Sequence, residues 1–397
     1  MSQHLTLISA DCHAGANHET YRSYLEAKYL DQFDAWRGRY KNPFRDLQDD
    51  GRSRNWDSAR RMKDLEADGQ VGEVVFPNTV PPFFPTAQHI APQPTAADYE
   101  LRRAGIRAHN RWLSDWCAEE PDRRAGIGQV FLNNVEDAVE DATWIAAHGL
   151  RGGVLIPGAP PDRPDIEPLY SNYYDPLWRT CEDLGLVVNH HSGGGAPNYG
   201  KHAASMLMWM AETPFYSRRA VTALVLSGVF ERFPTLKFVL TEIGASWLPP
   251  LIEQWDQFHA QMQHGRIGEM GMPVEARLKE KPSFYVDRNV WLGMSFPSPS
   301  EAETWKKIGA HKLMWGSDYP HNEACWPYTR EHLRRSFHDT PERELRMMLS
   351  ENIAGVYGFD LVKLAPLADQ VGPTLDEVRV PLDAIPEGAT SPAFYRN

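Results

Sequence analysis

The sequence predicts an α/β protein, a (β/α)8 TIM barrel in which eight parallel strands alternate with helices. Apolar runs of strand length recur along the chain, and most of them are followed by a stretch with helical periodicity. A length of 397 residues falls in the range of a barrel that carries insertions. No G-x-G-x-x-G motif follows an early strand, so a doubly wound open sheet is only the second choice.

The N-terminal half of the chain supplies four strands. The apolar run at residues 5–8 starts the first strand, and Gly15 follows it as a turn residue. Residues 14–56 are polar and irregular, which predicts a long loop over one mouth of the barrel. The remaining elements of this half are a helix at 57–68, a strand at 71–78, a helix at 97–119, a strand at 125–132, a helix at 135–148 and a strand at 151–157.

The C-terminal half continues the alternation. Asp175 and Pro176 open a helix, with the aspartate as N-cap and the proline at the first helical position. The elements after it are a strand at 186–192, helices within 203–232, a strand at 236–242, a helix at 246–262, a strand at 289–296, a helix at 300–309, a strand at 312–318 and helices at 327–338 and 341–356. We expect one barrel domain over residues 1–360 and an irregular extension at 361–397 that packs on the barrel or on an oligomer partner.

Composition limits the partners and the location of the protein. A net charge of -12 argues against nucleic acids and anionic membranes, since both bind basic surfaces. The chain has no apolar run of transmembrane length, and its first residues lack the pattern of a signal peptide. Its four cysteines lie far apart, which suits a reducing compartment. We expect a cytoplasmic enzyme for a small-molecule substrate, either a homodimer or associated with a related subunit.

Metal-binding side chains occur where several predicted strands end. The chemistry of such barrels takes place there, because the loops after the strands converge over one mouth. Asp11 and His13 lie two positions apart on the first strand and therefore share a face. The ends of the fifth, sixth and eighth strands add His190, His191, Glu242, Asp318 and His321. Such a mixture of imidazole and carboxylate groups binds Zn²⁺, Mn²⁺ or Fe²⁺.

Some of these residues have alternative roles. His190 and His191 point to opposite faces, so only one of them is expected to reach the ion, and the other is expected to pack or to support the ligands or the substrate. Alternation does not decide which is which. His321 is either a surface residue or a residue that touches the substrate or a second ion. Asn78, at the end of the second strand, and Trp291, on the seventh, are expected to contact the substrate or support the ligands.

Six segments, taken together in order, form a pattern that resembles the amidohydrolase superfamily. They are Ser-Ala-Asp-Cys-His at 9–13, Asp-Pro-Leu-Trp at 175–178, Val-Asn-His-His-Ser-Gly at 188–193, Leu-Thr-Glu-Ile-Gly-Ala-Ser-Trp-Leu-Pro at 240–249, Met-Trp-Gly-Ser-Asp-Tyr-Pro-His at 314–321 and Asn-Ile-Ala-Gly-Val-Tyr at 352–357. The resemblance is to the amidohydrolase-related branch, which contains metal-dependent hydrolases and aminocarboxymuconate-semialdehyde-type decarboxylases.

This resemblance implies one divalent ion, most often zinc, in the mouth of the barrel. The family positions carry over to Asp11, His13, His191, Glu242 and Asp318. The family histidine of strand five precedes Ser-Gly, which selects His191 over His190. Asp11 and Glu242 stand where many relatives have histidines, so the site is richer in oxygen, suits Mn²⁺ or Fe²⁺, and has enough ligands for two ions.

The same resemblance predicts hydrolysis of a small organic substrate, with Asp318 and His191 as catalytic residues. A bound ion lowers the pKa of water from ~15.7 towards ~7, and Asp318 accepts the proton and passes it to the leaving group. The alternative is a non-oxidative, metal-dependent decarboxylase, in which the ion holds the carboxylate of the substrate. A further alternative is an iron-dependent oxygenase, or a metal-binding partner subunit of one.

Overall fold

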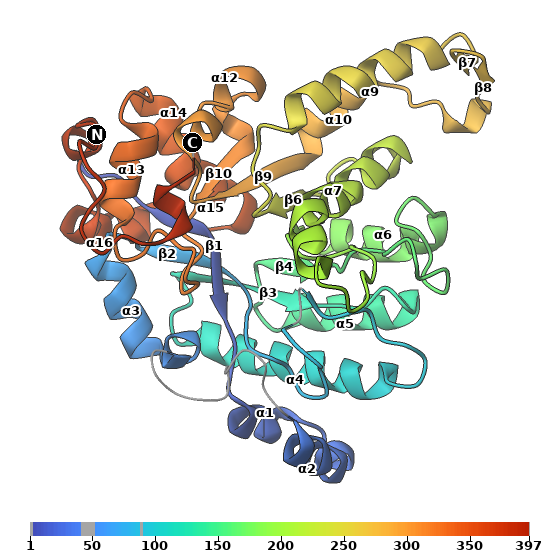
Figure 1. The fold of residues 1–397 in the computed structure, drawn as a ribbon, viewed down its shortest axis with the longest axis horizontal. Coiled ribbons are helices and arrows are strands. Elements are labelled where there is room, and N and C mark those ends of the chain that lie inside the picture. Colours follow the sequence, from blue (N-terminus) through green and yellow to red (C-terminus); the bar gives the residue numbers. More distant parts are fainter. Residues whose placement is uncertain (1–2, 41–51, 88–89, 397) are drawn as a thin grey trace.

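The computed structural model describes residues 3–40, 52–87 and 90–396. Its centre is a sheet of eight parallel strands in the order β1-β2-β3-β4-β5-β6-β9-β10, with helices on the outside (Figure 1). The strands are β1 (Ile8–Ala14), β2 (Gly72–Pro77), β3 (Arg124–Gln129), β4 (Gly153–Leu155), β5 (Val188–His191), β6 (Phe238–Thr241), β9 (Val290–Ser295) and β10 (Leu313–Gly316). The predicted (β/α)8 barrel is confirmed.

Backbone hydrogen bonds between the first and last strands close the barrel. The Asp318 N–H donates to Asp11 O over 2.8 Å, and the His13 N–H donates to Tyr319 O over 2.7 Å. Gly316 permits this approach, because a Cβ at its position would lie 2.6 Å from Asp11 Cβ. Closure excludes the open sheet and brings the metal-binding residues of β1 next to those that follow β10.

The helices bury their apolar sides against the strands. Trp178, Ile145 and Leu224, from three different helices, are fully buried in the shared core. The helices of this layer are α3 (Ser58–Ala67), α4 (Tyr99–Ala118), α5 (Val135–Ala147), α6 (Asp175–Asp183), α7 (Ser205–Leu226), α8 (Val229–Arg232), α9 (Leu248–Met262), α10 (Pro282–Asn289), α11 (Pro299–Ala302), α12 (Trp305–Ile308), α13 (Thr329–Phe337), α14 (Glu342–Arg346) and α15 (Asn352–Tyr357).

One predicted helix start differs in detail. Asp175 is the first residue of α6, and Tyr174 occupies the N-cap position without a capping side chain. The Asp175 carboxylate instead accepts two hydrogen bonds of 2.9 Å from Arg232. A salt bridge between α6 and α8 therefore replaces the predicted cap.

Both segments predicted to be irregular contain helices. The insertion after β1 forms α1 (His18–Tyr24) and α2 (Leu30–Arg39), and its residues 41–51 lie outside the described residues. The C-terminal extension forms α16 (Leu361–Val371) and α17 (Leu375–Val378), and the Leu5 N–H donates to Pro373 O over 2.8 Å beside them. The prolines in this extension concealed the periodicity of α16, which has Pro366 inside it.

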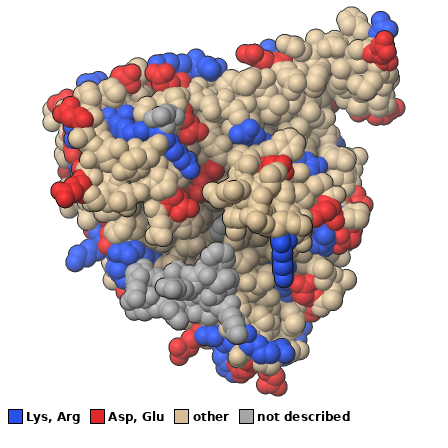
Figure 2. All heavy atoms as spheres, viewed as in Figure 1, with Lys and Arg blue, Asp and Glu red and all other residues tan. Residues whose placement is uncertain are grey.

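The helix predicted at 246–262 is α9, and it belongs to an arm between β6 and β9 whose other parts were not predicted. The arm consists of α9, a short hairpin of β7 (Arg266–Ile267) and β8 (Met270–Gly271), and α10, and it projects from the barrel (Figure 1). Acidic and basic side chains are interspersed over the face shown in Figure 2. None of the helices in the described ranges has the length and apolar character that crossing a membrane requires.

Candidate metal centre

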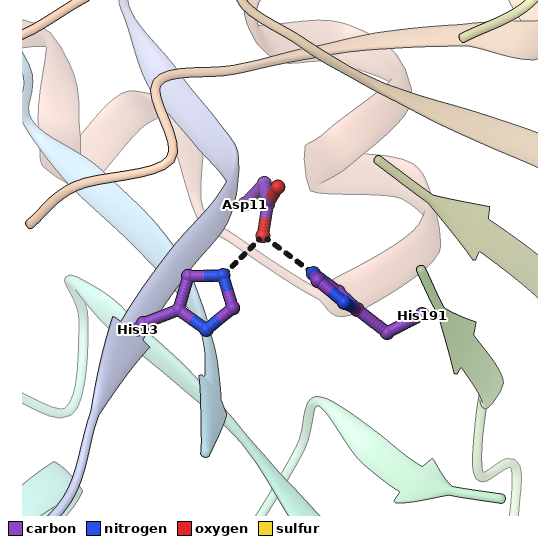
Figure 3. Close-up of side chains that lie close together, drawn as sticks. All are labelled: Asp11, His13 and His191. Atoms are coloured by element: carbon purple, nitrogen blue, oxygen red, sulfur yellow. Dashed lines mark ion pairs between the residues drawn. The ribbon is translucent and has the colours of Figure 1, made fainter. Parts of the chain in front are cut away.

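The ligand candidates of β1 face His191 of β5 across the mouth of the barrel. Asp11 Oδ1 lies 3.3 Å from His13 Nε2 and 3.4 Å from His191 Nε2, and Figure 3 shows both rings turned toward this oxygen. All three side chains are buried. Alternation along β1 produces this arrangement, since residues 11 and 13 share a face while Cys12 contacts Ser317 on the other side.

Backbone carbonyls orient both imidazole rings. His13 Nδ1 lies 3.3 Å from Pro77 O, and His191 Nδ1 lies 3.0 Å from Ser192 O. A carbonyl oxygen can only accept, so Nδ1 carries the proton in each ring and Nε2 is the ligand nitrogen of the neutral form. Metal-binding histidines are commonly held in this way.

Asp318 joins the cluster from the turn after β10. Its Oδ1 lies 3.1 Å from His13 Nε2 and 2.8 Å from His321 Nδ1. Asp318 has a φ of 62° and Glu242, directly after β6, has a φ of 63°. This left-handed conformation costs a non-glycine residue about 1–3 kcal/mol and is typical of functional sites. Two strands therefore end in strained residues at the mouth of the barrel.

His321 connects Asp318 to the end of β2. Its Nε2 lies 3.0 Å from Asn78 Oδ1, and Asn78 Nδ2 donates to Asn55 Oδ1 over 2.5 Å. Because the Asn78 nitrogen faces Asn55, its oxygen faces His321 and accepts from Nε2. The His321 ring also lies against His13, with 4.1 Å between ring centroids. These contacts turn Nδ1 of His321 toward Asp318.

The carboxylates of the mouth differ in protonation behaviour. Burial acts to raise the pKa of Asp11, but its contacts with His13 and His191 outweigh burial and hold this pKa below its ordinary value. Burial, followed by the negative charge of Asp318, raises the pKa of Glu242 well above its ordinary value. Glu242 therefore keeps its proton to a higher pH than Asp11 does.

The donor set at Asp11 fits a divalent cation. The ligand atoms of Asp11, His13 and His191 lie within 4.8 Å of one another, and Asp318 overlaps this group through His13. Asp11 Oδ1 and Asp318 Oδ2 are buried and accept no hydrogen bond from the described residues. A buried carboxylate oxygen without a partner is costly, and a cation offsets that cost.

Glu242 belongs to a neighbouring group rather than to the Asp11 cluster. Its ligand atom lies within 4.8 Å of those of Asp318, His321 and Glu323. Its closest recorded contact with the Asp11 cluster is 3.7 Å, from Oε2 to His191 Nδ1. Glu323 lies in the loop after β10 and was not predicted, because no strand-end pattern marks it. The five predicted ligands thus fall into neighbouring groups, with Asp11, His13 and His191 in one and Glu242 and Asp318 in another.

The structure separates two other predicted residues from the ligands. His190 points away from Asp11, and its Nδ1 donates to Ile156 O over 3.0 Å. Trp291 lies near the start of β9, where the Lys312 ammonium sits 3.9 Å from the centroid of its ring. It packs against the apolar cluster that contains Ile8, at the end of the barrel opposite the mouth. The structure therefore does not bring Trp291 to the site.

Two residues that support the site were missed. Ser295 Oγ donates to Asp11 Oδ2, and Arg61 Nη1 donates to His13 O over 2.8 Å. Ser295 ends β9, so the strand-end criterion that selected Asp318 would also have selected it. Arg61 lies inside a helix, and nothing in its sequence context distinguishes it from a surface residue.

A cavity of about 490 Å³ opens beside the cluster. Its lining includes His190, His191, Leu155, Arg163 and Trp209. The Arg163 guanidinium is already bound to Asp165 and to two backbone carbonyls. The cavity has the size and the largely apolar lining of a site for a small organic molecule.

Comparison with known proteins places the chain in a family. The sequence pattern of a family described as Amidohydrolase matches residues 11–359. The chain belongs to this amidohydrolase family. This result confirms the resemblance that the strand-end motifs predicted.

Relatives within the family carry names of decarboxylases. The chain is 26% identical over 248 residues to gamma-resorcylate decarboxylase from Polaromonas sp. (strain JS666 / ATCC BAA-500), covering 59% of this chain and 70% of that protein. The crystal structure of 5-carboxyvanillate decarboxylase from Sphingomonas paucimobilis matches with a TM-score of 0.64 and 18% identity, covering 90% of this chain and 100% of that one. A dihydroxybenzoic acid decarboxylase from Polaromonas sp. JS666, solved with bound manganese and 2-nitroresorcinol, matches with a TM-score of 0.61 and 17% identity over 89% and 97% of the two chains.

These relatives correct the predicted activity. Hydrolysis was the main prediction, yet the named activity of each of the three is decarboxylation. The prediction of a hydrolase is therefore wrong, and the alternative fits better. The error arose because hydrolysis and decarboxylation in this family use similar types of metal ligand. The residues that bind the ion therefore do not distinguish the two reactions.

Proposed function

We propose that this protein is a metal-dependent, non-oxidative decarboxylase of a small carboxylic acid that carries a ring or a conjugated system. The supporting observation is the buried cluster of Asp11, His13, His191 and Asp318, which opens on a cavity of about 490 Å³. The relative with 26% identity is a decarboxylase named for a resorcylate substrate, and the proposal extends that reaction class to this chain.

The reaction breaks the bond between the carboxyl group and its neighbouring carbon. Carbon dioxide leaves, the electron pair stays on the carbon, and a proton takes the place of the carboxyl group. A divalent cation at the cluster supplies positive charge that holds the substrate and stabilises the negative charge of the transition state. Asp11, His13 and His191 would hold that cation. Manganese and iron suit this mixed set of imidazole and carboxylate groups, and zinc, the ion predicted from the sequence, stays a prediction.

Asp318 is the residue that we assign to proton delivery. His13 and His321 both contact its Oδ1, which fixes the orientation of the carboxyl group. Its Oδ2 accepts no hydrogen bond from the described residues and can therefore carry a proton to the substrate carbon. Asn78 fixes the orientation of His321 and so positions Asp318 indirectly.

Carbon dioxide release tests this function. The full-length protein, loaded with Mn²⁺, is incubated with gamma-resorcylate or 5-carboxyvanillate, and CO2, the decarboxylated product and dissolved oxygen are measured together. We expect CO2 and product in equal amounts without oxygen uptake from at least one of the two acids, and none from Asp318→Asn. Product formed with oxygen uptake would contradict the proposal and support the iron-dependent oxygenase.

The remaining expectations concern partners and location. A homodimer or an association with a related subunit stays a proposal, as does a cytoplasmic location. Size-exclusion chromatography with light scattering on the purified chain tests the first. An active monomer would contradict both forms of association.

A further inference from the structure

We infer that His190 determines which acids the cavity binds, because its Nε2 accepts a hydrogen bond from a hydroxyl or amino group that the acid carries besides its carboxyl group. His190 lines the cavity of about 490 Å³ together with His191. Its ring is turned away from Asp11, so the metal centre does not use it. The inference rests on the proposed function, since it takes this cavity to be the place where the substrate lies.

The first argument is a buried nitrogen of His190 that has no partner. The His190 residue is 1% exposed, and Nδ1 donates to Ile156 O over 3.0 Å. A carbonyl oxygen can only accept, so Nδ1 carries the proton and Nε2 is the acceptor of the neutral ring. Nε2 has no hydrogen-bond partner among the described residues. A buried acceptor without a partner is costly, and a ligand that donates to it removes that cost.

The second argument is the space that Gly194 leaves beside this nitrogen. A Cβ at Gly194 would lie 3.0 Å from His190 Cε1, 3.6 Å from His190 Nε2 and 3.2 Å from Gly158 N. Gly193 and Gly195 have positive φ angles of 97° and 82°, but Gly194 does not, so its backbone conformation does not call for glycine. A side chain at residue 194 would instead occupy the place in front of the imidazole edge.

That space belongs to the cavity beside the metal centre. His190 also borders a second cavity, of about 450 Å³, between the loop after β4 and α7. Gly194 lines the first cavity and is not part of the lining of the second. A molecule in the first cavity can therefore approach Nε2.

The charged residues of the cavity favour a neutral donor over a second anionic group. Arg163 is the only arginine or lysine in the described lining, and its guanidinium is already bound to Asp165 and to two backbone carbonyls. The lining also contains Asp162, which repels an anion. A hydroxyl or amino group can donate to His190 Nε2, whereas a carboxylate can only accept.

A second histidine shows that an unpaired buried nitrogen is not sufficient for a binding site. His109 is fully buried, its Nδ1 lies 2.7 Å from Tyr21 Oη, and its Nε2 has no hydrogen-bond partner among the described residues. It does not line the cavity of about 490 Å³. His109 therefore serves as a matched control for His190.

The binding of substituted benzoates tests the inference. Full-length protein loaded with Mn²⁺ is titrated with benzoate, 3-hydroxybenzoate, 4-hydroxybenzoate and the methyl ethers of the two hydroxy acids, and dissociation constants are measured by calorimetry. We expect at least one hydroxy acid to bind about 10- to 100-fold more tightly than benzoate, since it gives Nε2 a donor. Its methyl ether should bind no more tightly than benzoate, because an ether oxygen cannot donate.

Three variants locate the interaction. His190→Asn keeps a donor for Ile156 O, because the amide nitrogen takes the place of Nδ1, but it removes the acceptor at Nε2. We expect the hydroxy acid to lose its advantage over benzoate in this variant, with the manganese content, measured by mass spectrometry, unchanged. Gly194→Ala keeps both histidines, fills the space in front of the ring and should also reduce the advantage. His109→Asn should retain it.

The outcomes separate this inference from the proposed function. Equal binding of benzoate and both hydroxy acids to the wild type, binding of none of them, or an advantage that survives in His190→Asn overturns the role of His190. Loss of manganese from that variant also overturns it and assigns His190 to the metal centre. If His190→Asn does not fold, Gly194→Ala decides, and an unchanged advantage there overturns the role. A preference for a hydroxy acid that depends on His190, in a protein that releases no CO2, contradicts the proposed function and leaves the binding role of His190 standing.

Discussion

Two clusters of buried charged side chains lie on neighbouring strands of this barrel, and in only one of them do arginines pair with the buried carboxylate. Arg61, Glu73 and Arg124 form the first, which we call the arginine cluster, and all three side chains are buried. Arg61 Nη2 lies 2.6 Å from Glu73 Oε2, and Arg124 Nε lies 3.4 Å from Glu73 Oε1. The other N–H groups of the two guanidinium groups donate to backbone carbonyls and to Ser58 Oγ.

The metal centre, formed on β1, on β5 and after β10, lacks such cations among the described residues. The carboxylates of Asp11 and Asp318 are paired with histidine rings and with no arginine or lysine of the described residues, and one oxygen of each accepts no hydrogen bond from those residues. Arg61 touches both clusters, since it pairs with Glu73 and also donates to His13 O. The comparison shows that burial of charged residues alone does not indicate a ligand site. A ligand site is indicated where buried carboxylates have no basic side chain to balance their charge.

The largest expected effect comes from the metal centre. Asp318→Asn keeps the size of the side chain but removes the charge and the proton that the reaction needs. We expect CO2 release to fall about 10³-fold or more while the protein stays folded. Rates and thermal unfolding are measured on the same preparations. Near-normal turnover would mean that Asp318 is not part of the reaction.

The arginine cluster should respond in the opposite way, through stability. Glu73→Gln removes the buried carboxylate that both guanidinium groups share and leaves Arg124 only the more distant Glu119, 3.8 Å away, which costs about 3–5 kcal/mol of unfolding free energy. Glu140 also pairs with two arginines, over 2.7 and 2.8 Å, but its side chain is 64% exposed. Glu140→Gln should therefore cost about 1 kcal/mol or less. Urea unfolding measures both, and equal losses would refute the contrast.

Asp68, another buried carboxylate, extends the comparison because its contribution to stability should depend on pH. Asp68 is hydrogen-bonded by the neutral groups of Thr329 and Gln70, and burial raises its pKa to about 7. Its stabilising contribution is complete below the pKa of the unfolded chain and is lost as pH rises to about 7, at up to about 1.4 kcal/mol per pH unit. Asp68→Asn removes this dependence. Urea unfolding at a series of pH values should show the free energy of unfolding of the variant rising relative to that of the wild type across that range. A difference that does not change with pH would contradict the raised pKa of Asp68.

The smallest expected effect lies at the edge of the metal centre. Asn78→Ala removes the acceptor of His321 Nε2 but no predicted ligand. We expect turnover to fall about 10-fold, as is usual for residues that orient ligands, with manganese content unchanged. Loss of manganese together with turnover would show instead that Asn78 maintains the cluster itself.

The sequence was sufficient to predict the barrel and the residues at its mouth. Strand periodicity located β1 and β10, and the strand-end criterion selected Asp11, His13 and Asp318, which barrel closure then brings together. The choice between His190 and His191 needed the family resemblance, because alternation along β5 allows either. The structure explains that choice, since His191 faces Asp11 while His190 donates to the carbonyl of Ile156, directly after β4.

Other features could not be predicted, for physical reasons. Glu323 lies in an irregular loop, and its place beside Glu242 depends on tertiary hydrogen bonds. The arginine cluster depends on Arg61 of α3 reaching Glu73 of β2, and Arg61 has no local pattern that reveals its burial. Trp291 was selected for its ring alone, and the position of a residue along its strand decides whether it reaches the mouth.

Calorimetric titration of Mn²⁺ into chelator-treated protein tests the central claim most directly. The comparison uses wild type, Asp11→Asn and Asp68→Asn, which make the same chemical change at two buried aspartates. The account predicts that Asp68→Asn binds as the wild type does, and that Asp11→Asn loses a binding step or weakens it about 100-fold. Identical titrations of all three proteins would contradict the claim that uncompensated charge at the mouth of the barrel is a metal centre.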